Sequence, residues 1–270
     1  MDLHPRLSVN PQAAGYRGFE DELRFWADLG VRRVGLMSMT LAPYGWDRGM
    51  AAARDAGLDV PYLVHGIYTT ITDSEGWKAD LESLLACVEG AREMGASCVY
   101  FCTGPPGKAT WEDAVALFGE RMQPVVTAAR AAGIGLAVEN TLSLRTEISF
   151  IHSVRDAVIA ARQIGIGICA DTYACWVERG LRETLRDNVD LLHLVQISDF
   201  KVGTMVQPNR WVPGDGDLPI ERIIRDVVDS GYAGVFDLEL LGPAIEQEGG
   251  QSAVRRGVAW MNGALTAADA

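Results

Sequence analysis

The chain lacks the features of a membrane protein, a disulfide scaffold or a nucleic-acid binder. None of its apolar runs reaches the length of a bilayer-spanning helix, and its five cysteines include no CxxC pair. Its 24 Lys and Arg residues are outnumbered by 36 Asp and Glu residues, which leaves a formal charge of −12. Because nucleic-acid binding depends on neutralising phosphates, we expect a small-molecule substrate and neither nucleic acid nor membrane as partner.

Two further absences narrow the fold and the cellular location. There is no GxGxxG or Walker pattern, which an open doubly wound sheet would typically carry after its first strand. No basic segment followed by an apolar stretch precedes the first expected strand, so we expect a cytoplasmic protein. The length of 270 residues suits one α/β barrel, and residues 1–270 are expected to form a single domain.

Short apolar runs alternate with longer amphipathic stretches, as in repeated βα units. The expected strands are Arg6 to Val9, Arg33 to Met37, Val60 to His65, Ser97 to Cys102, Gly135 to Glu139, Gly165 to Asp171, Leu191 to Ile197 and Gly234 to Leu240. The expected helices include Glu20 to Leu29, Trp77 to Met94, Trp111 to Ala132, His152 to Gln163 and Pro219 to Ser230. Glycines 57, 95, 133 and 165 stand where a left-handed residue would end a helix. The pattern predicts an α/β fold, a single (β/α)8 TIM barrel.

Polar residues end four of the expected strands, and in such a barrel the active site lies at the carboxyl ends of the strands. They are Glu139, Asp171, Gln196 and Glu239. Three carboxylates pointing into one mouth would repel one another unless a cation joined them. Carboxylate and amide oxygens suit Mg2+ or Mn2+, and the sequence therefore predicts one divalent metal ion, with Co2+ or Zn2+ as less expected occupants.

These strand ends are similar to those of the xylose isomerase-like sugar isomerases and epimerases. The resemblance extends over nearly the full length of the chain. That family holds its metal on Glu, Asp, His or Gln, and Glu at the ends of strands five to eight, and the segment 213–219, PGDGDLP, resembles its loop after strand seven. Gln196 is similar to the hydroxypyruvate isomerase and 3-dehydroshikimate dehydratase branches. The family's frequent His three residues after the strand-six Asp is replaced by Ala174. The resemblance implies that Glu139 and Glu239 move a proton while remaining metal ligands.

Other residues near the expected mouth are candidates for substrate contact. His65 ends the third strand and is expected either to donate to a substrate oxygen or to act as an acid on a departing hydroxyl, with a structural histidine as the alternative. Lys201 and Arg210 follow strand seven and are candidates to bind a carboxylate or phosphate. Trp46 and Trp176 are candidates for an apolar wall against the substrate, with packing between helix and barrel as the alternative.

Together these features predict a metal-dependent isomerase or epimerase of a small hydroxy-carbonyl compound, acting by proton abstraction next to a carbonyl. A metal-dependent lyase or dehydratase of a cyclic hydroxyketone is the alternative, followed by a non-catalytic binding barrel. A DNA-repair endonuclease with several zinc ions is disfavoured, because the chain has four histidines. The sequence leaves a homo-oligomer open.

Overall fold

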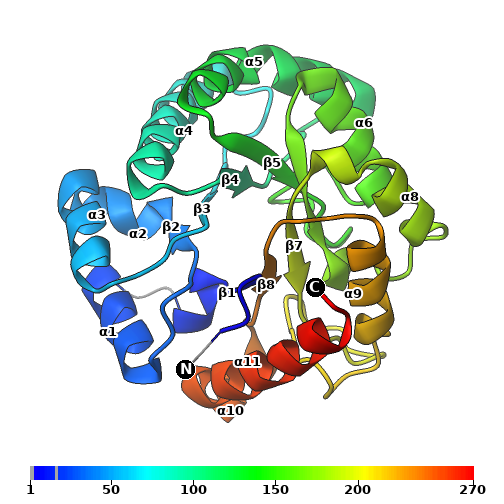
Figure 1. Cartoon of the computed structure of the whole chain (residues 1–270). Helices are drawn as coiled ribbons and strands as arrows, with labels where there is room; N and C mark the ends of the chain where they lie inside the picture. Colours follow the sequence, from blue (N-terminus) through cyan, green and yellow to red (C-terminus); the bar gives the residue numbers. More distant parts are fainter. Residues whose placement is uncertain (1–2, 16–17) are drawn as a thin grey trace.

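The computed structural model describes residues 3–15 and 18–270 of the chain. Its centre is an eight-stranded sheet in the order β1-β8-β7-β6-β5-β4-β3-β2, and all of its strand pairs are parallel. Helices follow the strands and form an outer ring, as the view along the barrel shows (Figure 1). The predicted α/β barrel is confirmed.

The ring closes between β1 and the segment that leads into β2. Val9 N donates to Arg33 O at 3.2 Å, and Gly35 N donates to Val9 O at 3.1 Å. Val9 and Val34 form a parallel bridge at the same place. The closed sheet therefore has no edge open to pairing with another strand.

Each predicted strand is present, β5 with the predicted bounds and the other seven with narrower ones. The strands are β1 Leu7–Val9, β2 Leu36–Met37, β3 Tyr62–His65, β4 Cys98–Phe101, β5 Gly135–Glu139, β6 Gly167–Asp171, β7 Leu192–Ile197 and β8 Phe236–Leu238. The helices are η1 Pro11–Ala14, α1 Phe19–Leu29, α2 Ser38–Tyr44, α3 Trp46–Asp55, α4 Ser74–Met94, α5 Trp111–Ala132, α6 Val154–Ile164, α7 Thr172–Cys175, α8 Leu181–Asp187, η2 Val189–Leu191, α9 Ile220–Asp229, α10 Pro243–Glu248 and α11 Gly250–Ala267.

The helix ends also agree with the sequence pattern. Glycines 57, 95, 133 and 165 have φ of 67°, 74°, 69° and 84°, as predicted for left-handed residues that end a helix. At the start of α5, Thr110 Oγ1 accepts from the backbone N–H of Asp113 at 3.2 Å. The capping residues thus fix where the outer helices stop and the inner strands begin.

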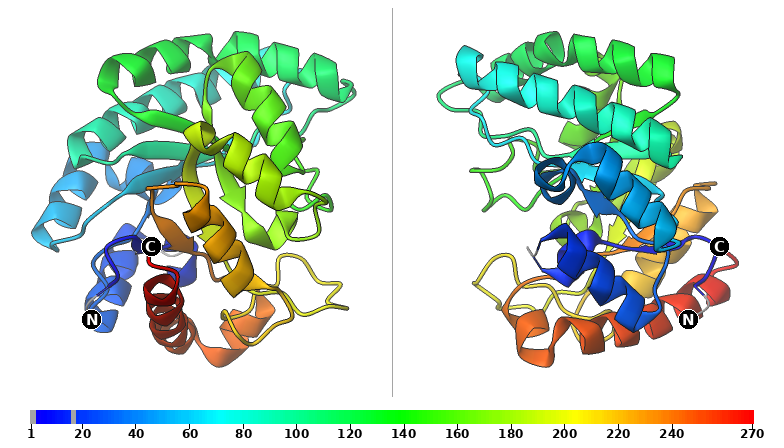
Figure 2. Two further views of the ribbon diagram at one scale, coloured as in Figure 1. Left: turned by 45° about the vertical axis from the view of Figure 1, so that its right-hand side comes forward. Right: turned by 90° about the vertical axis from the view of Figure 1, so that its left-hand side faces the viewer.

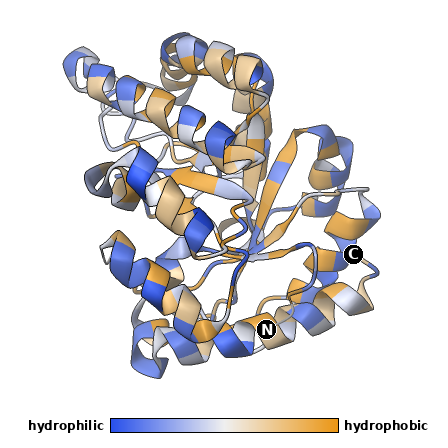
Figure 3. Ribbon diagram, turned by 60° about the vertical axis from the view of Figure 1, so that its left-hand side comes forward, coloured by the Kyte–Doolittle hydropathy of each residue, from blue (hydrophilic) through white to orange (hydrophobic). Residues whose placement is uncertain are grey.

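The barrel has two different ends. Loops that follow the strands, including the long segment between β7 and α9, gather at one end together with α10 (Figure 2). The strands are coloured mainly as hydrophobic, whereas the helices mix hydrophobic and hydrophilic residues (Figure 3). No helix within the described residues is both long and apolar enough to cross a bilayer.

Candidate active site

The structure brings the four strand-end residues to the carboxyl end of the barrel. Glu139 and Asp171 are the last residues of β5 and β6, Gln196 lies in β7, and Glu239 follows β8 directly. All four side chains are buried, and even Glu139, which has the largest exposed fraction among them, is only 7% exposed. Parallel strands in register place these ends next to one another, as predicted from the repeat of βα units.

A buried arginine from the loop after β7 joins two of these carboxylates. Arg210 Nη1 and Nη2 donate to Asp171 Oδ1 and Oδ2 at 3.0 and 2.9 Å, a bidentate pair. Arg210 Nη2 also lies 2.9 Å from Glu239 Oε2, and Nη1 donates to Ser198 Oγ at 2.9 Å. We expected Arg210 at the rim of the mouth; the structure places it inside, as the counterion of Asp171 and Glu239.

One guanidinium does not balance the three carboxylates. Burial, reinforced by the Asp171 carboxylate, raises the pKa of Glu139 to about 8. Burial also raises the pKa of Glu239 well above its ordinary value, although Arg210 opposes the shift. Three negative charges and one positive charge leave two negative charges without a partner, so the site favours either bound protons or a further cation.

The oxygen donors and the charge of the four strand-end side chains suit a divalent cation. Their present positions do not. Within the described part of the chain, no three His, Cys, Asp or Glu residues are grouped so that they could hold a metal ion. In this structure the Arg210 guanidinium is paired with both Asp171 and Glu239. Gln196 Nε2 and Glu239 Oε2 are buried without a hydrogen bond, although Glu239 Oε2 is within ion-pair distance of Arg210. The four predicted metal ligands therefore stay a prediction. To bind one ion together, they require the Arg210 guanidinium to move away from Asp171 and Glu239.

His65, the last residue of β3, faces the same space. Its Nδ1 lies 2.8 Å from Ser38 Oγ, and its Nε2 is buried with no partner among the described residues. Burial lowers its pKa to about 4, so the imidazole is neutral at physiological pH. The structure therefore provides His65 as a neutral hydrogen-bonding group.

Three of the residues predicted to contact substrate lie away from the cavity. Lys201 is exposed, with Nζ 4.1 Å from the centroid of the Trp211 ring. Trp46 packs on α4, where a Cβ added to Gly90 would lie 2.7 Å from the indole. Trp176 pairs with Phe200 at a centroid distance of 6.3 Å. For the two tryptophans, the structure shows the alternative stated above, packing against neighbouring elements instead of lining the cavity.

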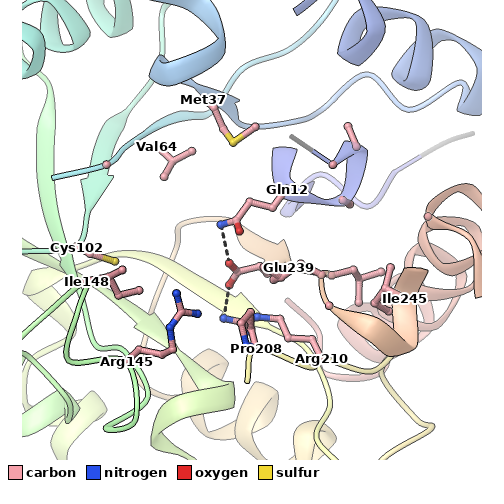
Figure 4. Close-up of a pocket in the computed structure, with 18 of the residues that line it drawn as sticks. Gln12, Met37, Val64, Cys102, Arg145, Ile148, Pro208, Arg210, Glu239 and Ile245 are labelled. Atoms are coloured by element: carbon pink, nitrogen blue, oxygen red, sulfur yellow. Dashed lines mark hydrogen bonds and ion pairs between the residues drawn. The ribbon is translucent and has the colours of Figure 1, made fainter. Parts of the chain in front are cut away.

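A cavity of about 850 Å3 opens above these strand ends. His65, Glu139, Arg210 and Glu239 contribute to its wall. Its apolar lining includes Val206 and, as Figure 4 shows, Met37, Val64, Ile148, Pro208 and Ile245. A cavity of this size accommodates a small organic molecule with one polar and one apolar side.

Sequence reasoning missed several polar residues of this site. Gln12 Nε2 donates to Glu239 Oε1 at 3.2 Å, and the Cys102 thiol lies 3.8 Å from Glu139 Oε2. Arg145 lines the cavity from the loop after β5. The available signal was position alone, since Cys102 ends the expected strand four and the other two residues follow shortly after the expected strands one and five.

A second buried network lies beside the site, inside the barrel. Asp237 of β8 accepts from Tyr62 Oη at 2.5 Å, from Ser8 Oγ at 3.1 Å and from Asn10 Nδ2 at 2.9 Å. Burial raises the pKa of Asp237 to about 6, against the effect of these hydrogen bonds. Because these hydrogen bonds use both carboxylate oxygens, Asp237 is better suited to bracing β8 than to ligand binding.

Comparisons with known proteins agree with this architecture. A family model described as the xylose isomerase-like TIM barrel matches residues 12–264. An inosose isomerase from Halalkalibacterium halodurans is 22% identical over 134 residues, 47% of this chain and 46% of that protein, so the match spans about half the length of the curated relative.

Two solved structures carry the same fold. The D-psicose 3-epimerase of Clostridium cellulolyticum H10, solved with D-tagatose, has a TM-score of 0.77 at 16% identity, covering 96% of this chain and 98% of that one. The IolI protein, solved with a zinc atom, has a TM-score of 0.81 at 14% identity, covering 97% and 98%. The family model covers most of the chain and confirms the resemblance in the strand ends: the chain belongs to the xylose isomerase-like TIM barrel family.

Proposed function

We propose that the protein is an isomerase or epimerase of a small hydroxy-carbonyl compound and that it works with one divalent cation. The observation that carries this proposal is the group of buried carboxylates from β5, β6 and the end of β8, which a single guanidinium leaves short of positive charge. The relatives named as isomerases and epimerases support the reaction class. The zinc atom in the IolI structure supports a divalent ion, and Mn2+ or Mg2+ remains our expectation for this donor set.

Glu139, Asp171, Gln196 and Glu239 would hold the cation. When bound, it would polarise the substrate carbonyl and increase the acidity of the neighbouring C–H. Arg210 then has to release Asp171 and Glu239, and it stays close enough to donate to a substrate oxygen.

Glu139 and Glu239 are the groups we assign to proton transfer. Both carboxyl groups line the cavity, and they come from strands on different sides of Asp171 and Gln196 in the barrel. One carboxylate removes the proton next to the carbonyl, and the same or the other carboxyl returns it. Return of the proton to the former carbonyl carbon, with the hydroxyl proton passing to the former carbonyl oxygen, gives isomerisation. Return to the opposite face of the original carbon gives epimerisation.

His65 is placed to bind a substrate oxygen. It lines the cavity, and its Nε2 is buried with no partner among the described residues. Burial lowers its pKa to about 4, so the imidazole would bind as a neutral group.

The test is deuterium exchange from heavy water into a panel of ketoses, followed by NMR. We expect exchange at a carbon next to the carbonyl, lost after chelation and restored by Mn2+. Glu139→Gln and Glu239→Gln should each abolish it, whereas Glu82→Gln on the exposed surface of α4 should not change it. Exchange that is unchanged in both cavity variants would remove these carboxylates from the reaction. Exchange that survives chelation at full rate would exclude the cation.

A further inference from the structure

The wall of the cavity carries one cation that the proposed chemistry does not use. Arg145 lies in the loop between β5 and α6, six residues after Glu139, and its side chain is 28% exposed. Figure 4 shows its guanidinium projecting into the space that the Glu239 carboxylate also faces. The loop is held by backbone bonds from Arg145 N to Leu142 O at 2.8 Å and from Ile148 N to Arg145 O at 3.1 Å. The side chain is thus presented by an ordered turn.

The donors of Arg145 are largely unused. Its Nε donates to Glu147 Oε1, and its two terminal nitrogens have no partner among the described residues. Glu147 is 59% exposed at its side chain, and an ion pair in contact with solvent is worth little. The pair with Glu147 therefore orients the guanidinium without occupying the two N–H pairs at its tip.

With the proposed divalent ion bound, the buried carboxylates of the site need no charge from Arg145. A divalent ion and Arg210 together balance Glu139, Asp171 and Glu239, since three positive charges face three negative ones. The remaining charged residue on the cavity wall is Glu246 of α10, which is exposed to solvent. Arg145 and Glu246 cancel in the total charge of the wall, and no buried carboxylate pairs with the terminal nitrogens of Arg145 among the described residues.

We propose that Arg145 is a specificity-determining residue that binds an anionic group of the substrate, either a carboxylate or a phosphate, so that the substrate is an acidic hydroxy-carbonyl compound. A planar guanidinium with free terminal nitrogens pairs with both oxygens of such a group. This inference deepens the proposed function and rests on it for the identity of the reaction, but not for the binding of the anion.

The experiment compares ligands that differ only at one end: D-fructose, D-fructuronate and D-fructose 6-phosphate. Affinity is measured by calorimetry with Mn2+ present, and deuterium exchange is measured in the same samples. We expect the wild-type protein to bind one of the two anions about 10- to 100-fold more tightly than fructose. Tighter binding of D-fructuronate would indicate a carboxylate site, and tighter binding of D-fructose 6-phosphate would indicate a phosphate site.

Two substitutions and one control identify the residue responsible. Arg145→Gln should remove the preference for the anion while leaving the affinity for fructose within about twofold, and Arg145→Lys should retain part of it. Arg225→Gln, on the exposed side of α9, should leave both affinities unchanged. Loss of affinity for fructose and the anions alike in Arg145→Gln overturns the proposal, as does a wild-type protein that binds no anion better than fructose.

The two proposals fail in different ways. Anion binding that depends on Arg145, without deuterium exchange into any ligand, supports the anion site and contradicts the isomerase. Exchange into fructose without preference for either anion supports the isomerase and overturns the role of Arg145.

Discussion

Arg210 holds a guanidinium in a buried position against two carboxylates, and this arrangement has a consequence for stability. Removing one partner of a buried ion pair leaves the other charge unsolvated. We predict that Arg210→Gln lowers the free energy of unfolding by about 3 kcal/mol in the absence of metal. Chemical denaturation of the wild type and the variant measures it, with Arg92→Gln, which breaks an exposed pair with Glu89, as control.

The same variant should respond more strongly to divalent ions. Without the guanidinium, Asp171 and Glu239 need another cation, so Mn2+ should raise the melting temperature of Arg210→Gln more than that of the wild type. An equal rise in both proteins would mean that the ion binds elsewhere.

Glu22 of α1 is a buried carboxyl group outside the active site, and its titration should be visible in the stability of the fold. Its Oε2 accepts from Thr40 Oγ1 at 3.1 Å, and burial raises its pKa from 4.5 to about 7. Between these values the folded protein binds more protons than the unfolded chain, so this residue makes stability fall as pH rises from about 4.5 to 7.

We predict that Glu22→Gln reduces the loss of stability between pH 5 and pH 8 by about 2 kcal/mol. Urea unfolding at both pH values measures this, and Glu20→Gln on the exposed side of the same helix is the control. A pH dependence identical to that of the wild type would show that Glu22 is not protonated in the folded state.

Among the elements, the segment between β7 and α9 depends on one carboxylate. Asp199 Oδ1 accepts from the backbone N–H of Phe200 at 2.8 Å and of Leu218 at 3.1 Å. Its Oδ2 accepts from Gly214 and Gly216, each at 2.9 Å. This carboxylate folds the PGDGDLP loop, and the same segment carries Arg210 into the site.

We predict that Asp199→Ala raises amide hydrogen exchange across residues 200–218 while exchange in β4 and β5 stays unchanged. Four backbone donors lose their acceptor, which should cost about 2 kcal/mol or more. Mass spectrometry of peptides resolves the two regions, and Asp217→Ala in the same loop, which removes one bond to Val202 N, gives a graded comparison. Uniform exchange throughout the protein would indicate global destabilisation instead.

At the scale of the whole molecule, closure of the barrel between β1 and the segment before β2 depends on Gly35, which has no side chain. A Cβ added at Gly35 would lie 2.1 Å from the Tyr62 ring, whose hydroxyl bonds to Asp237. Gly35→Ala should therefore displace Tyr62 and lower the free energy of unfolding by about 3 kcal/mol.

Gly263 in α11 provides the opposite case, because nothing lies within 4 Å of an added Cβ there. Gly263→Ala should raise the free energy of unfolding by about 0.5 to 1 kcal/mol. Equilibrium denaturation of both variants checks the two signs, and a stable Gly35→Ala variant would mean that Tyr62 can move freely.

The barrel was predictable because its signal repeats. Apolar runs, glycine helix ends and polar strand ends recur around the ring, and Glu139, Asp171, Gln196 and Glu239 follow from position alone. Loop side chains have no such period. Arg145 and Gln12 turn inward while Lys201 turns outward, and Arg210 is buried because the fold around Asp199 directs it there. These directions depend on contacts between residues far apart in the sequence, which composition and spacing do not encode.

The ion pairs of Arg210 with Asp171 and Glu239 also bear on how the protein matures in a cell. Because the chain supplies its own counterion, the barrel can assemble during synthesis without waiting for a metal ion. Binding of the proposed cation would then be a separate, later event. If the proposed metal dependence holds, cells starved of the metal would accumulate folded but inactive protein that regains activity when the ion is supplied, without new synthesis.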